Sequence, residues 1–419
     1  MKYPDYHDVP SGPLKYCQIS GKKDLELVID LGHQPLCDSL LTKEQLDHPE
    51  QFFPLRLYRS KSLGHAQLDY IVPGDKVYPN NYPYRPGITK EVVDHHAYQS
   101  KETIKKHSLS KNSFIIDIGS NDGTLLKAFK NNGMRVLGIE PTDTAKIAEK
   151  EGIETIQKPF TDSLGREIAN HYGKADIVTA TNVFAHMASL GEVIRGIENV
   201  LNDDGVFIFE NHYIIDILKG LQYDSIYHEH IRSYSLASII HLFNLYNFTV
   251  VDAEIVERYG GTLRVTVAKG KNKAVSNSIN KLINFEKGFG LFDNSAWKNF
   301  TKNVYKARND LLELAISAHD KNQRFVGKSC PGRCSTLVNF TGIDDHLMPY
   351  IAEQTTSLKL GLYLPGKHIP IVEDDVLYKE QPDYVLILAW HYWEPITKIL
   401  RDRGLKSKFV IPLPEVRII

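Results

Sequence analysis

The chain has 419 residues, of which 42% are hydrophobic and 24% are charged, so it is long enough for two or three folded domains and is neither disordered nor fibrous. Its 50 lysines and arginines are balanced by 51 aspartates and glutamates, which gives a net charge of −1. Such a chain carries no general positive field for holding a polyanion. We therefore expect no nucleic acid and no anionic membrane among its partners.

The start of the sequence has no apolar run of the kind that a secretion signal needs, and no later stretch reaches the roughly 18 apolar residues of a membrane span. These features predict a cytoplasmic protein. In that compartment the four cysteines are expected to be buried or free thiols rather than a disulfide framework.

Three segments of different pattern follow one another along the chain. Residues 1–90 contain many prolines and tyrosines and short alternating runs, which predict a small module of strands and loops. Residues 91–295 contain four short apolar runs separated by amphipathic segments, which indicate a parallel sheet covered by helices on both faces. The last of its crossover helices is predicted to stop at the turn 202–205. Residues 296–419 begin with a bridging helix after a polar connector and predict a smaller α/β domain.

The first of the four apolar runs, FIIDIGSNDGTLL, ends in a turn with chemical character. Gly119 and Gly123 allow a tight turn and a close approach of a ligand to the start of the following helix. The spacing differs from the three-glycine fingerprint of dinucleotide sites. Asp117 and Asp122 would repel a pyrophosphate but suit an ammonium group, and Glu140 is placed to accept hydrogen bonds from ribose hydroxyls.

This turn, together with the strings GIEP, QKPF and TNVFAH further along the chain, resembles the S-adenosylmethionine (SAM) site of the class I methyltransferase fold. The resemblance implies a central Rossmann-like domain with SAM as its cofactor. The residues that it implies for the SAM site are Asp117, Gly119, Asn121, Asp122, Gly123, Glu140, Phe160 and Asn182.

The densest polar and aromatic run of the chain is YDSIYHEHIRSYS, which places Tyr227, His228, Glu229 and His230 side by side. Such groups are costly to bury without a function. A solvated loop is one alternative. A metal site at His228 and His230 is another, but no other Cys or His spacing supplies the remaining ligands, and methyl transfer from a sulfonium needs no Lewis acid.

With this run, the resemblance extends over nearly the whole chain. The sequence is similar to the sugar C-methyltransferases that add a methyl group to carbon 3 of a nucleotide-linked 4-keto-6-deoxyhexose. The strings that carry the resemblance are DLGHQPLCDSLL, YPNNYPYRPGIT, ENHYI, YDSIYHEHIRSYS, YGGTLRV, LPGKHIPI, DYVLILAWH and IPLPE.

The family's chemistry requires a general base and hydrogen-bond donors. A ketone at carbon 4 acidifies the hydrogen on carbon 3, and the enolate left by its removal attacks the methyl group. The resemblance assigns the base to His230, because the ordinary pKa of histidine, about 6.5, lies near working pH. It makes Tyr227 and His186 donors to the enolate oxygen or the sugar, and Glu229 a residue that orients a histidine or binds the sugar. For His186, a structural role at a strand–helix junction is the alternative.

The resemblance also assigns residues to the acceptor substrate. Tyr82 and Tyr84 would line the sugar pocket, although they could equally pack within a proline-rich loop. The C-terminal domain would hold the nucleotide diphosphate, although each of its basic residues could also be a plain surface charge. The remaining residues implied in substrate binding are His228, Lys328, Arg333 and Lys367.

The sequence departs from the family at a structural zinc site that many members build from two Cys-x-x-Cys pairs. Here the first pair retains Cys17 alone, and the second reads Ser60-Lys61-Ser62-Leu63. One thiolate cannot build a four-thiolate site, so we predict that zinc is absent. A residual cluster of Cys17, Cys37 and His65 is the alternative. The strings GKSCPGRCST and Trp390-His391 also depart from the family, which leaves the identity of the nucleotide open.

Two other functions are compatible with the same fold. One is an O- or N-methyltransferase acting on a nucleotide-linked sugar, and the other is a binding protein for such sugars without catalysis. The presence of Asp117, Gly119, Glu140 and the cluster around His230 argues against a pure binding protein, which needs neither a sulfonium site nor a base. We expect a monomer.

Overall fold

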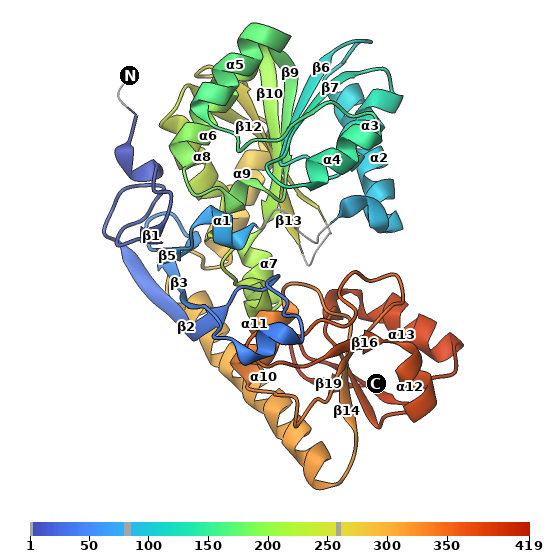
Figure 1. Cartoon of the computed structure of the whole chain (residues 1–419). Helices are drawn as coiled ribbons and strands as arrows, with labels where there is room; N and C mark the ends of the chain where they lie inside the picture. The colour runs from blue at the N-terminus through green and yellow to red at the C-terminus, as the bar shows by residue number, and fades with distance from the viewer. Residues whose placement is uncertain (1–2, 79–84, 257–260) are drawn as a thin grey trace.

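The computed structural model describes residues 3–78, 85–256 and 261–419, so Tyr82, Tyr84 and part of the YGGTLRV string lie outside the described residues. The chain forms an N-terminal, a middle and a C-terminal unit, each built around its own main sheet (Figure 1). Buried apolar side chains of all three units belong to one continuous cluster, which includes Leu57, Phe209 and Val326. The units therefore pack as one body.

The N-terminal unit is the predicted module of strands and loops. Its main sheet has the strand order β11-β4-β3-β2, with antiparallel pairing throughout. Strand β11 (Arg232–Ser233) comes from the middle of the chain and pairs with β4, so that Arg232 lies opposite Gln67. The other elements are η1 (Asp5–His7), β1 (Gly12–Pro13), β2 (Leu25–Pro35), η2 (Glu44–Asp47), β3 (Phe52–Ser60), β4 (Ala66–Leu68), β5 (Tyr70–Ile71), α1 (Gly74–Val77) and η3 (Pro86–Ile88).

The middle unit contains a seven-stranded sheet of order β12-β13-β10-β9-β6-β7-β8, parallel from β10 to β8. Its elements are α2 (Lys90–Lys106), β6 (Phe114–Ile118), α3 (Thr124–Asn131), β7 (Arg135–Ile139), α4 (Thr144–Lys150), β8 (Thr155–Ile156), α5 (Asp162–Tyr172), β9 (Ala175–Thr181), η4 (Phe184–His186), α6 (Leu190–Val200), β10 (Leu201–His212), α7 (Ile214–Lys219), η5 (Tyr223–Ser225), α8 (Leu236–Asn244), β12 (Phe248–Val256), β13 (Thr262–Lys269) and α9 (Asn277–Gly288).

Helices cover both faces of this sheet, as predicted. Every side chain of β6 is buried, because neighbouring residues of a strand point to opposite faces and both faces are covered. Ile115 packs with α3 and α4 on one face, and Ile116 belongs to the cluster with α5 and α6 on the other. This confirms the predicted α/β class of the middle unit.

Two local predictions differ from the structure. Helix α6 ends at Val200 and β10 begins at the next residue, so the predicted turn at 202–205 lies inside this strand. There it forms an irregularity in the pairing between β10 and β9. The predicted polar connector is short, since α9 begins at Asn277 with the side chain of Ser276 accepting a hydrogen bond from the backbone of Ser278.

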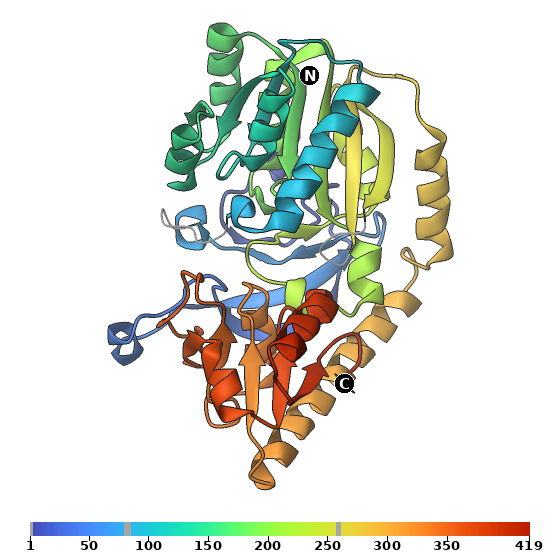
Figure 2. The same ribbon diagram turned by 90° about the vertical axis from the view of Figure 1, so that its right-hand side faces the viewer.

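The C-terminal unit has the strand order β16-β15-β14-β17-β18-β19, parallel except at β19, and confirms the predicted second α/β sheet (Figure 2). The long helix α10 (Ser295–Asp320) packs on β2, α7, α11 and β14 and so touches all three units. The remaining elements are β14 (Phe325–Lys328), α11 (Cys334–Thr341), β15 (Ile351–Glu353), β16 (Ile371–Glu373), α12 (Asp375–Glu380), β17 (Tyr384–Ile387), η6 (Trp390–Tyr392), α13 (Trp393–Asp402), β18 (Lys408–Ile411) and β19 (Arg417–Ile418).

All four cysteines are buried and free, which confirms the expectation of unpaired thiols. No helix in the described ranges is long and apolar enough to cross a membrane.

A polar network occupies the place where the family's zinc pairs would lie. Cys17 Sγ lies 3.8 Å from His65 Nε2. Asp24 accepts hydrogen bonds from the hydroxyl of Ser60 at 3.0 Å and from the backbone and hydroxyl of Ser62 at 3.0 and 2.6 Å. Residues 3–78 hold no group of three or more potential ligands that could bind a metal. One thiolate and one imidazole do not fit a tetrahedral structural zinc site.

Cys37 does not join this network, because its Sγ lies 3.7 Å from Thr336 Oγ1 of the C-terminal unit. The alternative cluster of Cys17, Cys37 and His65 is therefore wrong, whereas the absence of zinc stays a prediction.

We expect metal analysis of the purified protein to find zinc well below one ion per chain, and a chelator to leave the melting temperature unchanged. Stability should depend on Asp24 instead. Asp24→Ala removes the acceptor of three hydrogen bonds and should lower the free energy of unfolding by about 1–3 kcal/mol in urea titrations. Asp30→Ala is the matched control, since Asp30 accepts one exposed bond from Gly32. Stoichiometric zinc would contradict this prediction.

Candidate functional site

The turn between β6 and α3 requires glycine at two positions. Gly119 has a φ of 72°, and a Cβ atom there would lie 2.6 Å from the methyl carbons of Val183. Gly123 has a φ of 77° and precedes the first residue of α3. Residues other than glycine are strained in this left-handed region. The turn therefore keeps its backbone open toward the carboxyl ends of β6 and β9.

Three carboxylates surround this turn. Asp117 accepts a hydrogen bond of 2.7 Å from the hydroxyl of Thr179, while burial raises its pKa to about 7. Asp122 accepts bonds from the backbone of Gly87 at 2.9 Å and the hydroxyl of Thr124 at 2.6 Å. Asp122 thereby joins the turn to η3 of the N-terminal unit.

Glu140, at the end of β7, fixes the turn from the neighbouring strand. Its carboxylate accepts bonds from the backbone of Asn121 at 3.0 Å and from the backbone and hydroxyl of Thr142 at 2.9 and 2.7 Å. A carboxylate oxygen has two lone pairs, so these bonds leave Glu140 able to accept a further donor.

Three buried polar atoms beside the turn have no hydrogen-bond partner among the described residues: Ser120 Oγ, Thr181 Oγ1 and Asn182 Oδ1. Asn182 also has a left-handed φ of 56°. Buried polar atoms are normally paired, so this concentration at the ends of β6 and β9 fits the place of a polar ligand. The residues present are thus compatible with SAM. Phe160 lies apart, against Gly196 of α6, and its predicted contact with SAM stays a prediction.

Three histidines from separate elements meet at the carboxyl edge of the same sheet. His186 ends η4, His212 ends β10, and His230 lies between η5 and β11. The ring centroid of His230 is 5.0 Å from that of His186, 4.8 Å from that of His212 and 4.0 Å from that of Tyr227. His212 is not among the residues predicted from the sequence, although its place at the end of a strand in ENHYI was an available signal.

His230 has a defined protonation state. Its Nδ1 lies 2.7 Å from the carbonyl oxygen of Ser225, and a carbonyl oxygen only accepts, so Nδ1 carries the hydrogen and Nε2 carries the lone pair. Burial, assisted by the positive charge of Arg333, lowers its pKa to about 4. The expectation of a base with an ordinary pKa was therefore wrong, because it ignored the loss of solvation. At neutral pH the ring is a neutral acceptor.

The neighbouring groups are also held in their neutral forms. Burial lowers the pKa of His186 and of His212 well below its usual value. Burial and the charge of Glu229 raise the pKa of Tyr227 well above its usual value, so this phenol remains a hydrogen-bond donor. Tyr78, which the sequence analysis did not select, stacks on His186 with ring centroids 6.1 Å apart.

His228 lies outside the three-histidine cluster. It is buried against Phe53 of β3, with ring centroids 5.9 Å apart, and burial lowers its pKa to about 4. His228 and His230 do not belong to any potential metal group of the described residues.

The C-terminal unit contacts the segment that carries His230 through a buried ion pair. Arg333 donates to both oxygens of Asp224 at 2.8 and 2.7 Å and to the side-chain oxygen of Gln222 at 3.1 Å. Trp390 Nε1 donates to the same carboxylate at 2.7 Å. These contacts fix η5, whose last residue, Ser225, lies five positions before His230.

The predicted phosphate partners have different surroundings. Arg333 is paired with Asp224, and buried Lys328 lies 3.2 Å from Asp374. Lys367 is half-buried in the loop before β16. Two of the three charges are thus already balanced by carboxylates, and a role in phosphate binding stays a prediction. His391 lies near Arg333, with a pKa lowered to about 3 and a buried Nδ1 that lacks a partner among the described residues.

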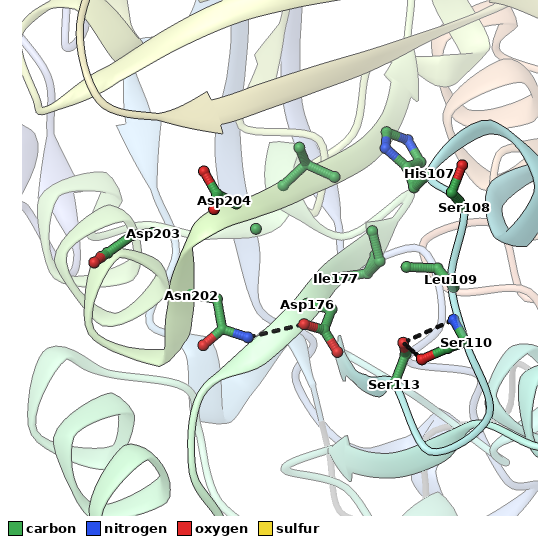
Figure 3. A pocket seen from close by; sticks show the side chains of 12 residues that line it. His107, Ser108, Leu109, Ser110, Ser113, Asp176, Ile177, Asn202, Asp203 and Asp204 are labelled. Carbon is green, nitrogen blue, oxygen red and sulfur yellow. Dashed lines mark hydrogen bonds between the residues drawn. The ribbon is translucent and has the colours of Figure 1, made fainter.

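A pocket of about 470 Å³ lies at the opposite edge of the sheet (Figure 3). It is lined by residues that precede β6 or begin β9 and β10, such as His107, Asp176 and Asn202, and Asn202 donates to Asp176 at 2.9 Å. None of the predicted site residues lines it. The candidate site is therefore the carboxyl edge and not this pocket.

Three family models match consecutive parts of the chain. Residues 17–78 match the "Putative zinc binding domain", residues 94–253 the "Methyltransferase domain", and residues 257–414 the "C-methyltransferase C-terminal domain". The chain is 29% identical over 412 residues to the C-methyltransferase NovU of Streptomyces niveus, covering 97% of both proteins.

Two further similarities each cover less than half of this chain. A ubiquinone biosynthesis O-methyltransferase of Actinobacillus pleuropneumoniae serotype 7 is 31% identical over 102 residues, which are 23% of this chain and 44% of that protein. A solved structure of magnesium protoporphyrin IX methyltransferase from Synechocystis, with S-adenosylhomocysteine bound, is 14% identical with a TM-score of 0.34, covering 43% of this chain and 85% of that chain.

Buried neutral histidines make stability depend on pH. The folded-state pKa is about 4 for His7, His228 and His230 and about 3 for His391, below the usual 6.5. Between these values each of these four histidines binds more protons in the unfolded chain than in the folded chain. Each should therefore lower stability below about pH 6.5, by up to about 1.4 kcal/mol per pH unit. Burial raises the pKa of Asp117 and of Glu286 to about 7, so these two carboxyls offset part of that loss.

Urea unfolding at pH 7.5 and 5.5 measures this loss. His228→Gln should reduce the difference by about 1 kcal/mol, whereas the exposed His48→Gln should leave it unchanged. Equal stability at the two pH values would contradict the assignment of neutral buried rings.

Proposed function

We propose that this chain is a SAM-dependent C-methyltransferase that methylates carbon 3 of a nucleotide-linked 4-keto-6-deoxyhexose through an enolate. The observation that carries the proposal is the neutral His230, whose ring lies among those of His186, His212 and Tyr227 at the edge that also bears the glycine turn. An O- or N-methyltransferase has no need for groups that stabilise an enolate.

The residues of the chain divide the chemistry between a base and donors. SAM, when bound at the glycine turn, supplies an electrophilic methyl group. His230 takes the hydrogen of carbon 3 as a proton on Nε2, and the C–H electron pair moves toward the carbonyl oxygen at carbon 4. Tyr227 and neutral His186 donate hydrogen bonds to that oxygen as its negative charge develops. Glu229 orients a histidine or binds the sugar.

Binding of the substrates follows the division of the chain into residues 1–90, 91–295 and 296–419. The middle domain holds SAM through residues that include Asp117, Asn121 and Asn182. The C-terminal domain holds the nucleotide diphosphate at the carboxyl ends of β14 and β17, which is where open parallel sheets bind ligands. The proposed acceptor contacts are Tyr82, Tyr84, His228, Lys328, Arg333 and Lys367. The active form is a monomer.

Proton exchange tests the enolate. In deuterated water with S-adenosylhomocysteine in place of SAM, the protein should exchange the carbon-3 hydrogen of a nucleotide-linked 4-keto-6-deoxyhexose, followed by NMR. His230→Ala should slow this exchange about a hundredfold or more, since it removes the general base. His319→Ala, at the exposed end of α10, is the matched control and should exchange normally.

Calorimetric titration with S-adenosylhomocysteine confirms that each of these variants is folded. Methyl transfer to a sugar without exchange at carbon 3 would favour an O- or N-methyltransferase, and a normal exchange rate in His230→Ala would move the base to another residue.

The glycine turn has its own test. Gly119→Ala places a methyl group against Val183 and should weaken S-adenosylhomocysteine binding by at least about tenfold in calorimetry. Gly32→Ala is the matched control, because Gly32 has a similar φ of 79° but open space around it, and it lies in β2. Equal affinities for the two variants would exclude the turn from the SAM site.

A further inference from the structure

Arg232 is a buried cation at the border between the N-terminal and middle units. Its side chain is among the largest that are fully buried, with 1% of the residue exposed. The guanidinium donates to the hydroxyl of Tyr234 at 3.1 Å, to the side-chain oxygen of Gln18 and to the carbonyl oxygen of Met187. All three acceptors are neutral.

The other buried arginines of the described ranges are paired differently. Arg59 contacts Glu26 at 2.6 Å, and Arg333 contacts Asp224 at 2.7 Å. Arg232 forms no ion pair with any carboxylate in the parts of the chain that the structure describes. A buried charge is costly unless another charge balances it. A missing counter-charge beside a reaction site therefore points to a balancing charge that arises during the reaction.

Arg232 is also attached to the segment that carries His186. It donates to the carbonyl of Met187, and Gln18, the same residue that accepts from Arg232, donates to the carbonyl of Ala188 at 2.7 Å. Two side chains thus hold consecutive carbonyls directly after His186. They fix the backbone that follows this residue.

The positive charge of Arg232 acts on the donor side of the site. It contributes to the lowered pKa of His186 and opposes the raised pKa of Tyr78. Arg232 is not among the causes that lower the pKa of His230. The cation that acts on His230 is Arg333, whose charge is already balanced by Asp224. The field of Arg232 therefore falls where an oxyanion would be stabilised rather than on the base.

The charged and titratable groups that face His186 come from several elements. His230 and Arg232 both lower its pKa, His212 is coupled to it, and Tyr78 stacks on its ring. Glu229 raises the pKa values of Tyr78 and Tyr227.

We propose that Arg232 is a positioning and charge-balancing residue of the methyl-transfer site, which orients neutral His186 toward the acceptor and stabilises the negative charge that develops on the acceptor's carbonyl oxygen. This inference rests on the proposed function. When the C–H bond at carbon 3 breaks, the proton goes to Nε2 of His230 and the electron pair goes to the oxygen at carbon 4. The new anion then lies near an unpaired cation in a site of low dielectric, where such attraction is strong.

Two variants and a control test the role. Arg232→Met removes the charge and the hydrogen bonds, and Arg232→Lys keeps the charge but cannot reproduce the planar fork of donors. Arg59→Met is the matched control, because Arg59 is also buried in the N-terminal sheet but is paired with Glu26. Each variant is first checked for folding by thermal melting and by S-adenosylhomocysteine binding.

The first readout is independent of the acceptor. NMR titration of histidine-labelled protein with S-adenosylhomocysteine bound, assigned with His186→Gln, reports the pKa of His186. Arg232→Met should raise this pKa, although burial and His230 still hold it below the usual value, whereas Arg232→Lys and Arg59→Met should leave it unchanged. An unchanged pKa in folded Arg232→Met overturns the proposal.

The second readout is the carbon-3 exchange rate. Arg232→Met should lower it about a hundredfold, the scale of a lost oxyanion-stabilising group, and Arg232→Lys about tenfold. A rate within about threefold of that of Arg59→Met overturns the proposal. If the wild-type protein exchanges no keto-sugar, the proposed function fails, and the His186 titration still decides whether Arg232 acts on this ring.

Discussion

The site depends on how residues 222–233 are held between the three units. At the start of this segment Asp224 receives two bonds from Arg333 and one from Trp390, all from the C-terminal unit. At its end Arg232 lies opposite Gln67, where β11 pairs with β4 of the N-terminal sheet. His230 lies between these two attachments and has no helix or strand of its own to fix it. Its position is therefore a property of the assembled protein.

Exclusion of water follows from this arrangement and sets the electrostatics of the site. His186, His212 and His230 are all held neutral, and Tyr227 stays protonated, with burial as the first cause in each case. A neutral imidazole can accept a proton, and its other nitrogen can donate a hydrogen bond, so one residue type can serve as base and as donor. The same loss of solvation makes a buried histidine a weak base, so stabilisation of the product anion becomes the more important requirement of the proposed reaction.

The SAM side of the site has a simpler origin. The glycine turn follows β6 directly, and Glu140 follows the neighbouring strand β7. Because the carboxyl ends of parallel strands meet at one edge, short stretches of sequence are enough to bring these groups together. The groups around His230 and Arg333, in contrast, come from β10, η4, η5, α11 and η6, which span nearly half of the chain.

The sequence by itself determined the α/β class of the middle and C-terminal units, the small N-terminal module and the glycine turn, because strand burial, helix periodicity and tight turns are local properties that a few consecutive residues specify. It also indicated His230 and Tyr227. Only the tertiary structure decided that His212 joins them, that Arg333 is balanced by Asp224 and that Cys37 contacts Thr336 while Cys17 contacts His65. It also decided that Arg232 is buried without a carboxylate partner among the described residues. Those outcomes depend on contacts between residues tens to hundreds of positions apart and on the solvation lost at them, which no local pattern encodes.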